Sequence, residues 1–128
     1  MHALTRKPTS PAAKATEALG AIIFPGNFGE PENIEKAAKW CYGVFLNVYP
    51  VFTDPDGEVK HARNIISACR RAGVKKMVYS SATRVSDYPK MIADGRLELG
   101  SFPASYFRSK HQIQEEVKKA GFDGWTIL

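Results

Sequence analysis

The sequence predicts a single α/β domain in which a parallel sheet is wrapped by helices on both faces. Five short apolar runs rich in β-branched and aromatic residues alternate with four amphipathic helical patterns. The runs are nearly continuous in apolar character, as expected of strands that are buried on both faces. The connections are short, and parallel neighbours need crossover helices, so the alternation indicates a doubly wound arrangement. A chain of 128 residues has room for one such domain, over residues 1–128.

The expected elements follow one another along the whole chain. The first helix, Pro11–Leu19, begins with a proline at an early helical position and ends at Gly20. The second helix runs from Pro31 to about Trp40. The five expected strands are His2–Thr5, Ala21–Phe24, Val44–Val48, Lys76–Ser80 and Trp125–Leu128.

The third helix, Glu58–Ala72, has the clearest helical pattern. Its apolar residues recur at helical spacing on one stripe: Ala62, Ile65, Ile66 and Cys69. The fourth helix covers roughly Ser105–Ala120. Two irregular stretches, Pro50–Gly57 and Val85–Ala104, follow strand ends, where open α/β sheets bind ligands, so we expect a site there.

Composition and charge narrow the classes of partner. With 44% hydrophobic and 24% charged residues, the chain is neither collagen-like nor disordered. The net charge of +5 favours anionic ligands. The basic residues of Val59–Ser86 lack interleaved aromatics and mostly alternate with the apolar stripe of one helix, which fits a solvated helix face, so no nucleic acid is expected. No apolar run is long enough to span a bilayer, and no leader-like stretch follows Met1. We therefore expect a cytoplasmic protein without a membrane partner.

The sequence gives no indication of a metal site. Its three histidines are scattered and form no ligand pattern with Cys41 or Cys69. The two cysteines have no CxxC spacing and fall on expected helical segments, so they are interpreted as reduced thiols.

A glycine-rich turn between the first strand and first helix would normally indicate a dinucleotide-binding site in such a domain. Neither GxGxxG nor GxxGxxG occurs in this chain. Either the protein binds no dinucleotide, or the first strand-turn-helix unit of the usual fold is missing from the chain.

Several consecutive segments resemble the NmrA-like family, a group of atypical short-chain dehydrogenases/reductases with a Rossmann-like fold. The matching segments are HALTRKP, FPGNFGEPENIEKAAK, YGVFLNV, HARNIISACRRAGVKKMVYSSAT and YFRSKHQIQEEVKKAGFDGWTIL. In that family a first strand and glycine loop come before the segment that starts here at Met1, and a substrate-binding portion follows the segment that ends at Leu128. The resemblance implies a partial, truncated NAD(P)-binding Rossmann-like domain.

The family's strand order of 3-2-1-4-5-6 makes the missing first strand the central one. His2–Thr5 and Val44–Val48 would then each lack a neighbour. Unsatisfied buried backbone groups cost about 1–3 kcal/mol each, so we predict low stability or a rearranged sheet. The two strands either pair with each other, or another chain supplies a strand, which would favour self-association or a protein partner at the exposed edges.

The resemblance also implies cofactor-binding residues. Arg6, after the first strand present, resembles the basic residue that pairs with the 2′-phosphate of NADP, although a surface Arg-Lys pair is also commonly just solvated. Asn27 and Phe28 match the loop that borders the adenine, and the simpler alternative is an Asn-containing turn. Asn47 ends the strand that approaches the ribose and nicotinamide. The expected cofactor is NADP, with NAD as an alternative.

The expected catalytic residues are Ser81, Tyr106 and Lys110. Tyr106 and Lys110 form a YxxxK motif, and this spacing places both side chains about 6 Å apart on one helix face. In short-chain dehydrogenases the tyrosine transfers a proton, the lysine lowers its pKa and holds the ribose, and a serine binds the reacting oxygen. Alternatively, Tyr106 is a packing aromatic and Lys110 a cofactor contact or a snorkelling lysine.

Three functions remain open at this point. The first is an NADP-dependent oxidoreductase that acts on a small-molecule carbonyl or C=C substrate with Tyr106 as proton donor. The second is a non-catalytic dinucleotide-sensing regulator that binds a partner protein. The third is a truncated product without cofactor binding, because several aligned backbone N–H donors are missing.

Overall fold

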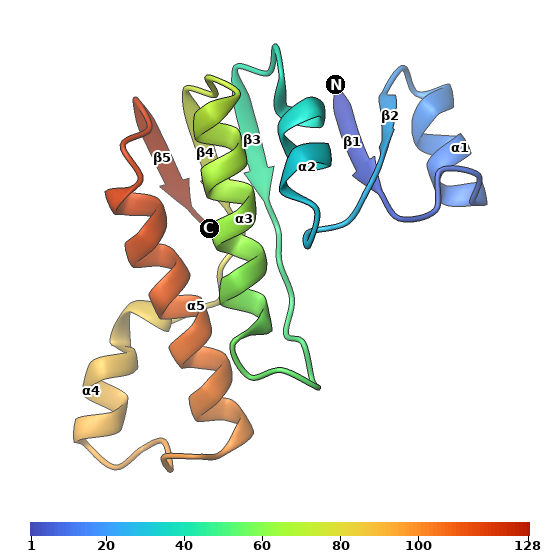
Figure 1. Cartoon of the computed structure of the whole chain (residues 1–128). Helices are drawn as coiled ribbons and strands as arrows, with labels where there is room; N and C mark the ends of the chain where they lie inside the picture. The colour runs from blue at the N-terminus through green and yellow to red at the C-terminus, as the bar shows by residue number, and fades with distance from the viewer.

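The computed structural model describes every residue from Met1 to Leu128 and confirms the α/β class (Figure 1). The strands pair in parallel within each sheet, and the strand arrows that are visible in Figure 1 point the same way. In chain order the elements are β1 (His2–Thr5), α1 (Pro11–Ala18), β2 (Ile22–Pro25), α2 (Pro31–Ala38), β3 (Gly43–Leu46), α3 (Gly57–Arg71), β4 (Lys76–Tyr79), the 3-10 turn η1 (Val85–Asp87), α4 (Tyr88–Ala93), α5 (Phe102–Lys119) and β5 (Gly124–Ile127).

The helices number five, where the sequence predicted four. The additional helix, α4, lies in the stretch that was expected to be irregular; it has a proline in its first turn and stops before Gly95, which has a positive φ of 67°. Helix α5 also begins earlier than expected, because the Ser101 side chain caps it by accepting a hydrogen bond from the Ala104 N–H.

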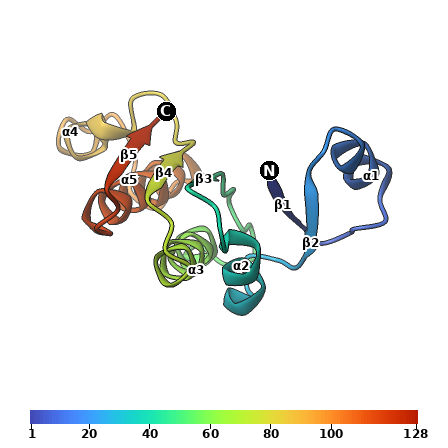
Figure 2. The same cartoon turned by 90° about the horizontal axis from the view of Figure 1, so that it is seen from above.

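The strands form two separate sheets. β1 pairs with β2, while β3, β4 and β5 form a second sheet with β4 in the middle. β1 and β3 do not pair, so the expected closure of these two strands onto each other does not occur. Figure 2 shows β1 standing apart from β3 when the molecule is viewed from above.

Helices α2, α3 and α5 lie next to one another and cover one face of the strands (Figures 1 and 2). Burial in β3 and β4 therefore alternates: Leu46 and Tyr79 are buried under the helices. On the opposite face, Phe45 is 60% exposed, its partner Val78 is half-buried, and Thr126 of β5 is exposed. The expectation that these strands are buried on both faces holds for one face only, because no helix covers the other.

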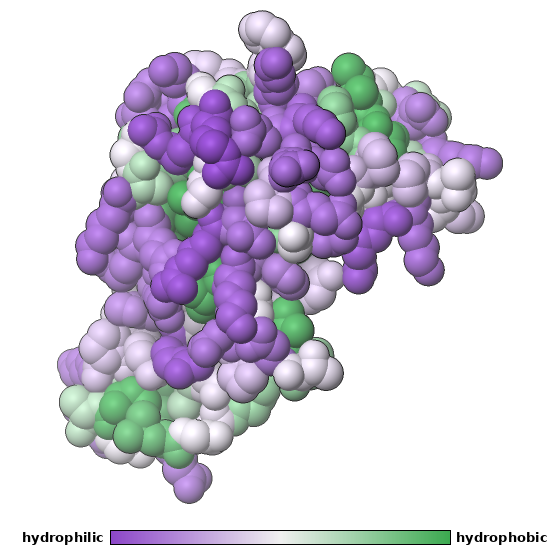
Figure 3. Space-filling view, viewed as in Figure 1, coloured by the Kyte–Doolittle hydropathy of each residue, from purple (hydrophilic) through white to green (hydrophobic).

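The main core lies between these three helices and the β3–β4–β5 sheet. It contains sixteen buried residues, among them Met77, Ile113 and Val117, and the first of them along the chain is Ile34. Hydrophilic side chains cover the outer sides of α3 and α5, whereas hydrophobic ones gather near α4 (Figure 3). None of the helices combines the length and apolar character needed to cross a membrane.

Candidate functional site

A buried ion pair joins the first turn of α3 to the middle of α5. Glu58 and Lys110 are 2% and 4% exposed, and the Lys110 ammonium lies 2.7 Å from the Glu58 carboxylate. The ammonium also donates a hydrogen bond of 2.9 Å to the Val48 carbonyl, just after β3. An isolated charge removed from water is strongly unfavourable, so these partners are what allow a lysine in this position.

Tyr106 lies one helical turn before Lys110, on the same side of α5. The Lys110 Nζ is 5.7 Å from the centre of the Tyr106 ring, a distance at which a cation and an aromatic face attract. Tyr106, Glu58 and the exposed Phe52 and Phe102 line a pocket of about 240 Å³. The structure thus brings Tyr106 and Lys110 together beside a pocket at the carboxyl end of β3.

Ser81 contacts α5 through a side-chain hydrogen bond. It follows β4, and its hydroxyl accepts a hydrogen bond of 3.0 Å from the Gln114 side chain. Its backbone N–H donates to the Leu128 carbonyl at 3.0 Å, which fixes the residue between β4 and β5. Gln114 is one turn beyond Lys110 on α5, so Ser81 is linked to the motif helix through an amide and has no direct hydrogen bond with Tyr106 or Lys110.

Tyr79 occupies the space beneath Lys110. Its side chain is fully buried, its ring centre is 5.7 Å from the Lys110 Nζ, and its hydroxyl has no hydrogen-bond partner in the chain. Burial, with a further contribution from the Glu58 charge, raises the pKa of Tyr79 well above its ordinary value. Tyr79 therefore stays protonated and cannot act as a base near neutral pH.

Sequence reasoning missed Glu58, although the chain contains a signal for it. Glu58 lies four residues before Ala62, and so at the start of the apolar stripe of α3. A carboxylate on a buried stripe requires a partner, just as Lys110 on the buried face of α5 does. A carboxylate on the buried stripe of α3 and an ammonium on the buried face of α5 together predict a contact between these two helices.

Two of the residues expected to contact the adenosine end of the cofactor are Arg6 and Asn27. Arg6 is exposed and forms no ion pair, so its guanidinium is free to meet an anion. The Asn27 side chain is occupied by a local turn: its Oδ1 accepts from the Gly29 N–H at 2.7 Å, and its Nδ2 donates to Glu30. Asn27 would have to give up these contacts to bind a ring edge.

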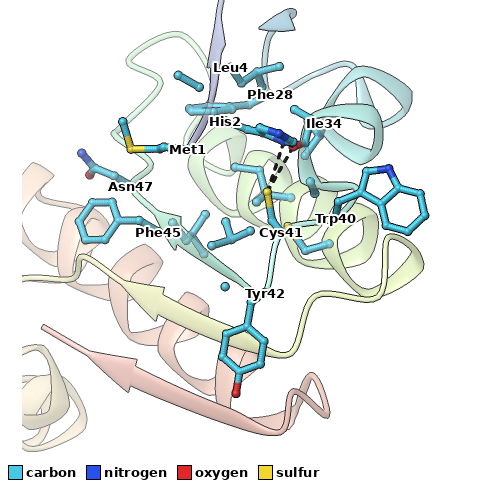
Figure 4. A pocket seen from close by; sticks show the side chains of 18 residues that line it. Met1, His2, Leu4, Phe28, Ile34, Trp40, Cys41, Tyr42, Phe45 and Asn47 are labelled. Atoms are coloured by element: carbon cyan, nitrogen blue, oxygen red, sulfur yellow. Dashed lines mark hydrogen bonds between the residues drawn. The ribbon is translucent and has the colours of Figure 1, made fainter. Parts of the chain in front are cut away.

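Phe28 and Asn47 differ from each other in their surroundings. The half-buried Phe28 ring lies 6.4 Å from Tyr49 and 5.9 Å from His61, and its carbonyl accepts a hydrogen bond from Asn64. Asn47 is exposed just after β3. Both residues border a groove between β1 and β3 (Figure 4).

The described residues match a dinucleotide only in part. Arg6 provides a charge for a phosphate, and Asn47 provides a free amide. A pyrophosphate, however, needs several backbone N–H groups converging from a glycine-rich turn, and the sequence contains no such turn. No cluster of histidine, cysteine and carboxylate side chains with the arrangement of a metal site occurs in the structure.

Comparison with known proteins gives a consistent result. The sequence model of the NmrA-like family matches residues 1–126. The chain is 29% identical over 126 residues to the NmrA-like family domain-containing oxidoreductase ptmS of Penicillium ochrochloron, covering 94% of this chain and 35% of that protein. It is 40% identical over 94 residues to the oxidoreductase notA of Aspergillus sp. (strain MF297-2), covering 69% of this chain and 28% of that protein. The chain thus spans about a third of the length of such relatives.

Solved structures share the fold at low sequence identity. An NADPH-dependent quinone oxidoreductase from Escherichia coli, complexed with NADPH, superposes with a TM-score of 0.75 at 20% identity, covering 98% of this chain and 38% of that one. A triphenylmethane reductase from Citrobacter sp., complexed with NADP(H), gives a TM-score of 0.71 at 17% identity, with the same coverage.

Proposed function

The chain belongs to the NmrA-like family, and on that premise we propose that it carries the proton-transfer residues of an NADP(H)-dependent oxidoreductase of the atypical short-chain dehydrogenase/reductase type. The observation that carries the proposal is the buried Lys110–Glu58 pair beside Tyr106. A charged lysine is expensive to bury, so a structural role alone would be served better by an apolar residue. The pair lies at the carboxyl end of β3, and open α/β sheets bind ligands at the carboxyl ends of their strands.

In this proposal the Tyr106 hydroxyl donates the proton to the substrate. The nearby ammonium of Lys110 favours the tyrosinate that remains and so lowers the cost of the transfer. Ser81, held by Gln114, offers a hydroxyl for the reacting oxygen. Glu58 keeps Lys110 in place, and the aromatic rings of Phe52 and Phe102 give the pocket apolar walls. The bound nicotinamide would supply the hydride.

The substrate class in this proposal is a small molecule with a carbonyl or an activated C=C bond. The cofactor would be NADP(H) in preference to NAD(H), because the free Arg6 guanidinium can pair with a 2′-phosphate. Asn47 and Phe28 would contact the cofactor along the strand ends. The two unpaired cysteines suit a reducing compartment, in line with a cytoplasmic location.

One observation favours a second candidate, a regulator that binds dinucleotides without turnover. The Lys110 ammonium already contacts Glu58 and the Val48 carbonyl, and Gln114 already occupies the Ser81 hydroxyl. Groups that are engaged in this way are less available to a ribose or a substrate oxygen. In a regulator with the same fold, Tyr106 would transfer no proton.

The deciding experiment compares Tyr106→Phe with Tyr88→Phe. Calorimetry with NADPH and NADH measures binding, and NADPH oxidation is followed with a panel of quinones and aromatic ketones. Loss of one general acid is expected to lower turnover by about 10²–10⁴-fold in Tyr106→Phe and leave NADPH binding intact. Tyr88 lies on α4 against His111, away from the pocket, so Tyr88→Phe should keep its activity.

The outcomes separate the candidates. NADPH binding without turnover by the unaltered chain would favour the regulator. Equal turnover by both variants would show that Tyr106 is not the proton donor. Absence of NADPH binding by a folded chain would contradict both candidates.

A further inference from the structure

Two phenylalanine rings from different parts of the chain stack at the pocket beside Tyr106. Phe52 lies in the loop between β3 and α3, Phe102 is the first residue of α5, and both segments lie at the same end of the molecule (Figure 1). The two ring centres are 5.9 Å apart, with 21° between the ring planes. The Phe102 ring is in turn 6.3 Å from the Tyr106 ring, at 31°. The three rings therefore form one row that ends at the proposed proton donor.

The backbone that carries these rings is held in place. In the loop, the Asp54 N–H donates to the Val51 carbonyl at 3.0 Å, and the Gly57 N–H donates to the Asp54 carbonyl at 2.9 Å. Gly57 also packs directly against Val51, because a Cβ added to the glycine would lie 2.7 Å from the Val51 Cβ. On α5, the Ser101 cap fixes the turn that carries Phe102. The rings are thus positioned before any ligand binds, which reduces the conformational entropy that binding costs.

The carboxylates around this pocket are already paired. Three of them lie on its wall or next to a lining residue in the chain. Each has a counter-charge, and the pairs are Asp54–Lys60 at 2.7 Å, Asp56–Arg108 at 3.1 Å and Glu58–Lys110 at 2.7 Å. A charged substrate would lose hydration here without gaining an unpaired counter-charge. The pocket is therefore suited to an uncharged molecule.

The volume and the ring spacing limit the shape of the substrate. The pocket holds about 240 Å³, and an apolar cavity of about 150 Å³ accepts one benzene ring, so there is room for a single ring and its reacting group. Aromatic rings stack at centre distances of about 4.5–7 Å, so a ring between Phe52 and Phe102 would need them about 9 Å apart. At 5.9 Å, the pair admits no third ring between its members. A substrate ring would instead lie against the pair, in the pocket.

We propose that Phe52 and Phe102 determine the substrate specificity of this site. They select an uncharged carbonyl compound with one aromatic ring, which stacks on the pair while the carbonyl oxygen meets the Tyr106 hydroxyl. This inference rests on the proposed function, because it takes Tyr106 as the proton donor. The quadrupole of a π-system favours offset and tilted stacking, which a saturated ring of the same size cannot provide. A preference for an aromatic ring over a saturated one is therefore the property that the two phenylalanines add.

Three ketones of similar size test the inference on the whole chain: acetophenone, cyclohexyl methyl ketone and para-acetylbenzoate. Binding is measured by NMR titration, and turnover by the oxidation of NADPH. Acetophenone is expected to bind about 2–10-fold more tightly than cyclohexyl methyl ketone, which is the range that one aromatic contact contributes. The carboxylate of para-acetylbenzoate should make this compound the weakest ligand of the three.

Three phenylalanine-to-leucine variants locate the effect. Phe52→Leu and Phe102→Leu keep an apolar side chain but remove the π-system. Each should lower the affinity for acetophenone by about 2–10-fold and leave the affinity for cyclohexyl methyl ketone unchanged. Phe45→Leu is the matched control, because the Phe45 residue is as exposed as Phe102, at 60% against 58%, but does not line this pocket. It should keep the preference for the aromatic ketone.

Failure of this inference and failure of the proposed function give different results. The inference is overturned if acetophenone binds no more tightly than cyclohexyl methyl ketone, or if para-acetylbenzoate binds as tightly as acetophenone. It is also overturned if Phe52→Leu and Phe102→Leu keep the preference as Phe45→Leu does. None of these results depends on turnover. The proposed function fails if NADPH binds and no ketone or quinone is reduced, and a preference for acetophenone in that case would still support the role of the ring pair.

Discussion

The β1–α1–β2 unit and the β3–β4–β5 unit are built from strands of equal length and parallel pairing, yet only the second has a core. Before Ile34, the buried residues are Ala13 and Ala21 alone. In the second unit, Leu46, Met77 and Tyr79 are each at most 1% exposed. The apolar runs that form the strands are similar in both units, so strand sequence does not account for the difference.

Helix coverage explains the contrast. Helices α3 and α5 lie across β3, β4 and β5, and their own apolar stripes face the strands. Helix α1 contributes one buried residue, Ala13, and packs beside β2 at the edge of the molecule (Figure 1). The first unit is attached mainly through α2, where the His2 ring is 2.7 Å from the Ala37 carbonyl. We infer that the second unit carries most of the free energy of folding.

The largest predicted effect comes from the buried charge pair of the second unit. Glu58→Gln leaves the Lys110 ammonium buried without its counter-charge, and we expect a loss of about 3–5 kcal/mol in the free energy of unfolding. Urea denaturation followed by circular dichroism measures it. The double variant Glu58→Gln/Lys110→Met should recover part of the loss, and an undiminished loss would mean that the pair is not the cause.

One leucine-to-alanine substitution in each unit compares the contributions of the two units to the free energy of unfolding. Leu46→Ala removes a side chain that is 1% exposed and should destabilise the protein by about 2–5 kcal/mol. Leu4→Ala makes the same change in the half-buried β1 and should cost clearly less. Equal losses in denaturant titrations would contradict the inference that the second unit carries the stability.

The pH dependence of the second unit can be tested through Cys69. Burial raises the pKa of the Cys69 thiol from 9.0 to about 12, because the thiolate would be desolvated. The unfolded chain ionises first, so this contribution is fully present below pH 9 and is lost as the pH rises toward 12. The loss is about 1.4 kcal/mol for each pH unit in that window.

Denaturation of Cys69→Ala at several pH values provides the measurement. The variant should lose less stability than the unaltered chain between pH 9 and 12. Val74→Ala, which removes a buried side chain that cannot ionise, supplies the matched control and should lose as much stability over this range as the unaltered chain. Parallel curves for all three proteins would argue against a buried, protonated Cys69.

The smallest effect is expected at an exposed ion pair that connects α2 to α3. Arg71 and Glu35 approach to 2.6 Å, but their side chains are 51% and 41% exposed. Glu35→Gln should therefore change the free energy of unfolding by about 0–1 kcal/mol, with any effect reduced by salt. A loss as large as that of Glu58→Gln would mean that burial does not distinguish the two pairs.

The sequence predicted most of the fold because helix and strand signals are local. The apolar stripe of α3 and the ending of helices at glycines placed the elements within a few residues of their positions in the structure. The exposure of Phe45 was not predictable in this way. An apolar run indicates a strand, but only the neighbouring elements decide how many of its faces are covered.

The candidate site was predictable where it depends on spacing along one helix. The YxxxK spacing does bring Tyr106 and Lys110 to one side of α5. The contact between Lys110 and Glu58 spans two helices, and that of Ser81 with Gln114 spans a loop and a helix. Such contacts depend on how elements pack, which no local pattern specifies. The roles assigned to these residues, and to Arg6, Asn27, Phe28 and Asn47, stay predictions.

The bare edges of β1 and β3 also affect how the chain behaves in solution. Unpaired strand edges act as templates on which further chains add, so they set a limit on the concentration at which the protein stays dispersed. The net charge of +5 opposes this through repulsion, and dissolved salt weakens that repulsion. Colloidal stability should consequently fall as ionic strength rises, and purification at low salt should keep the chain in solution.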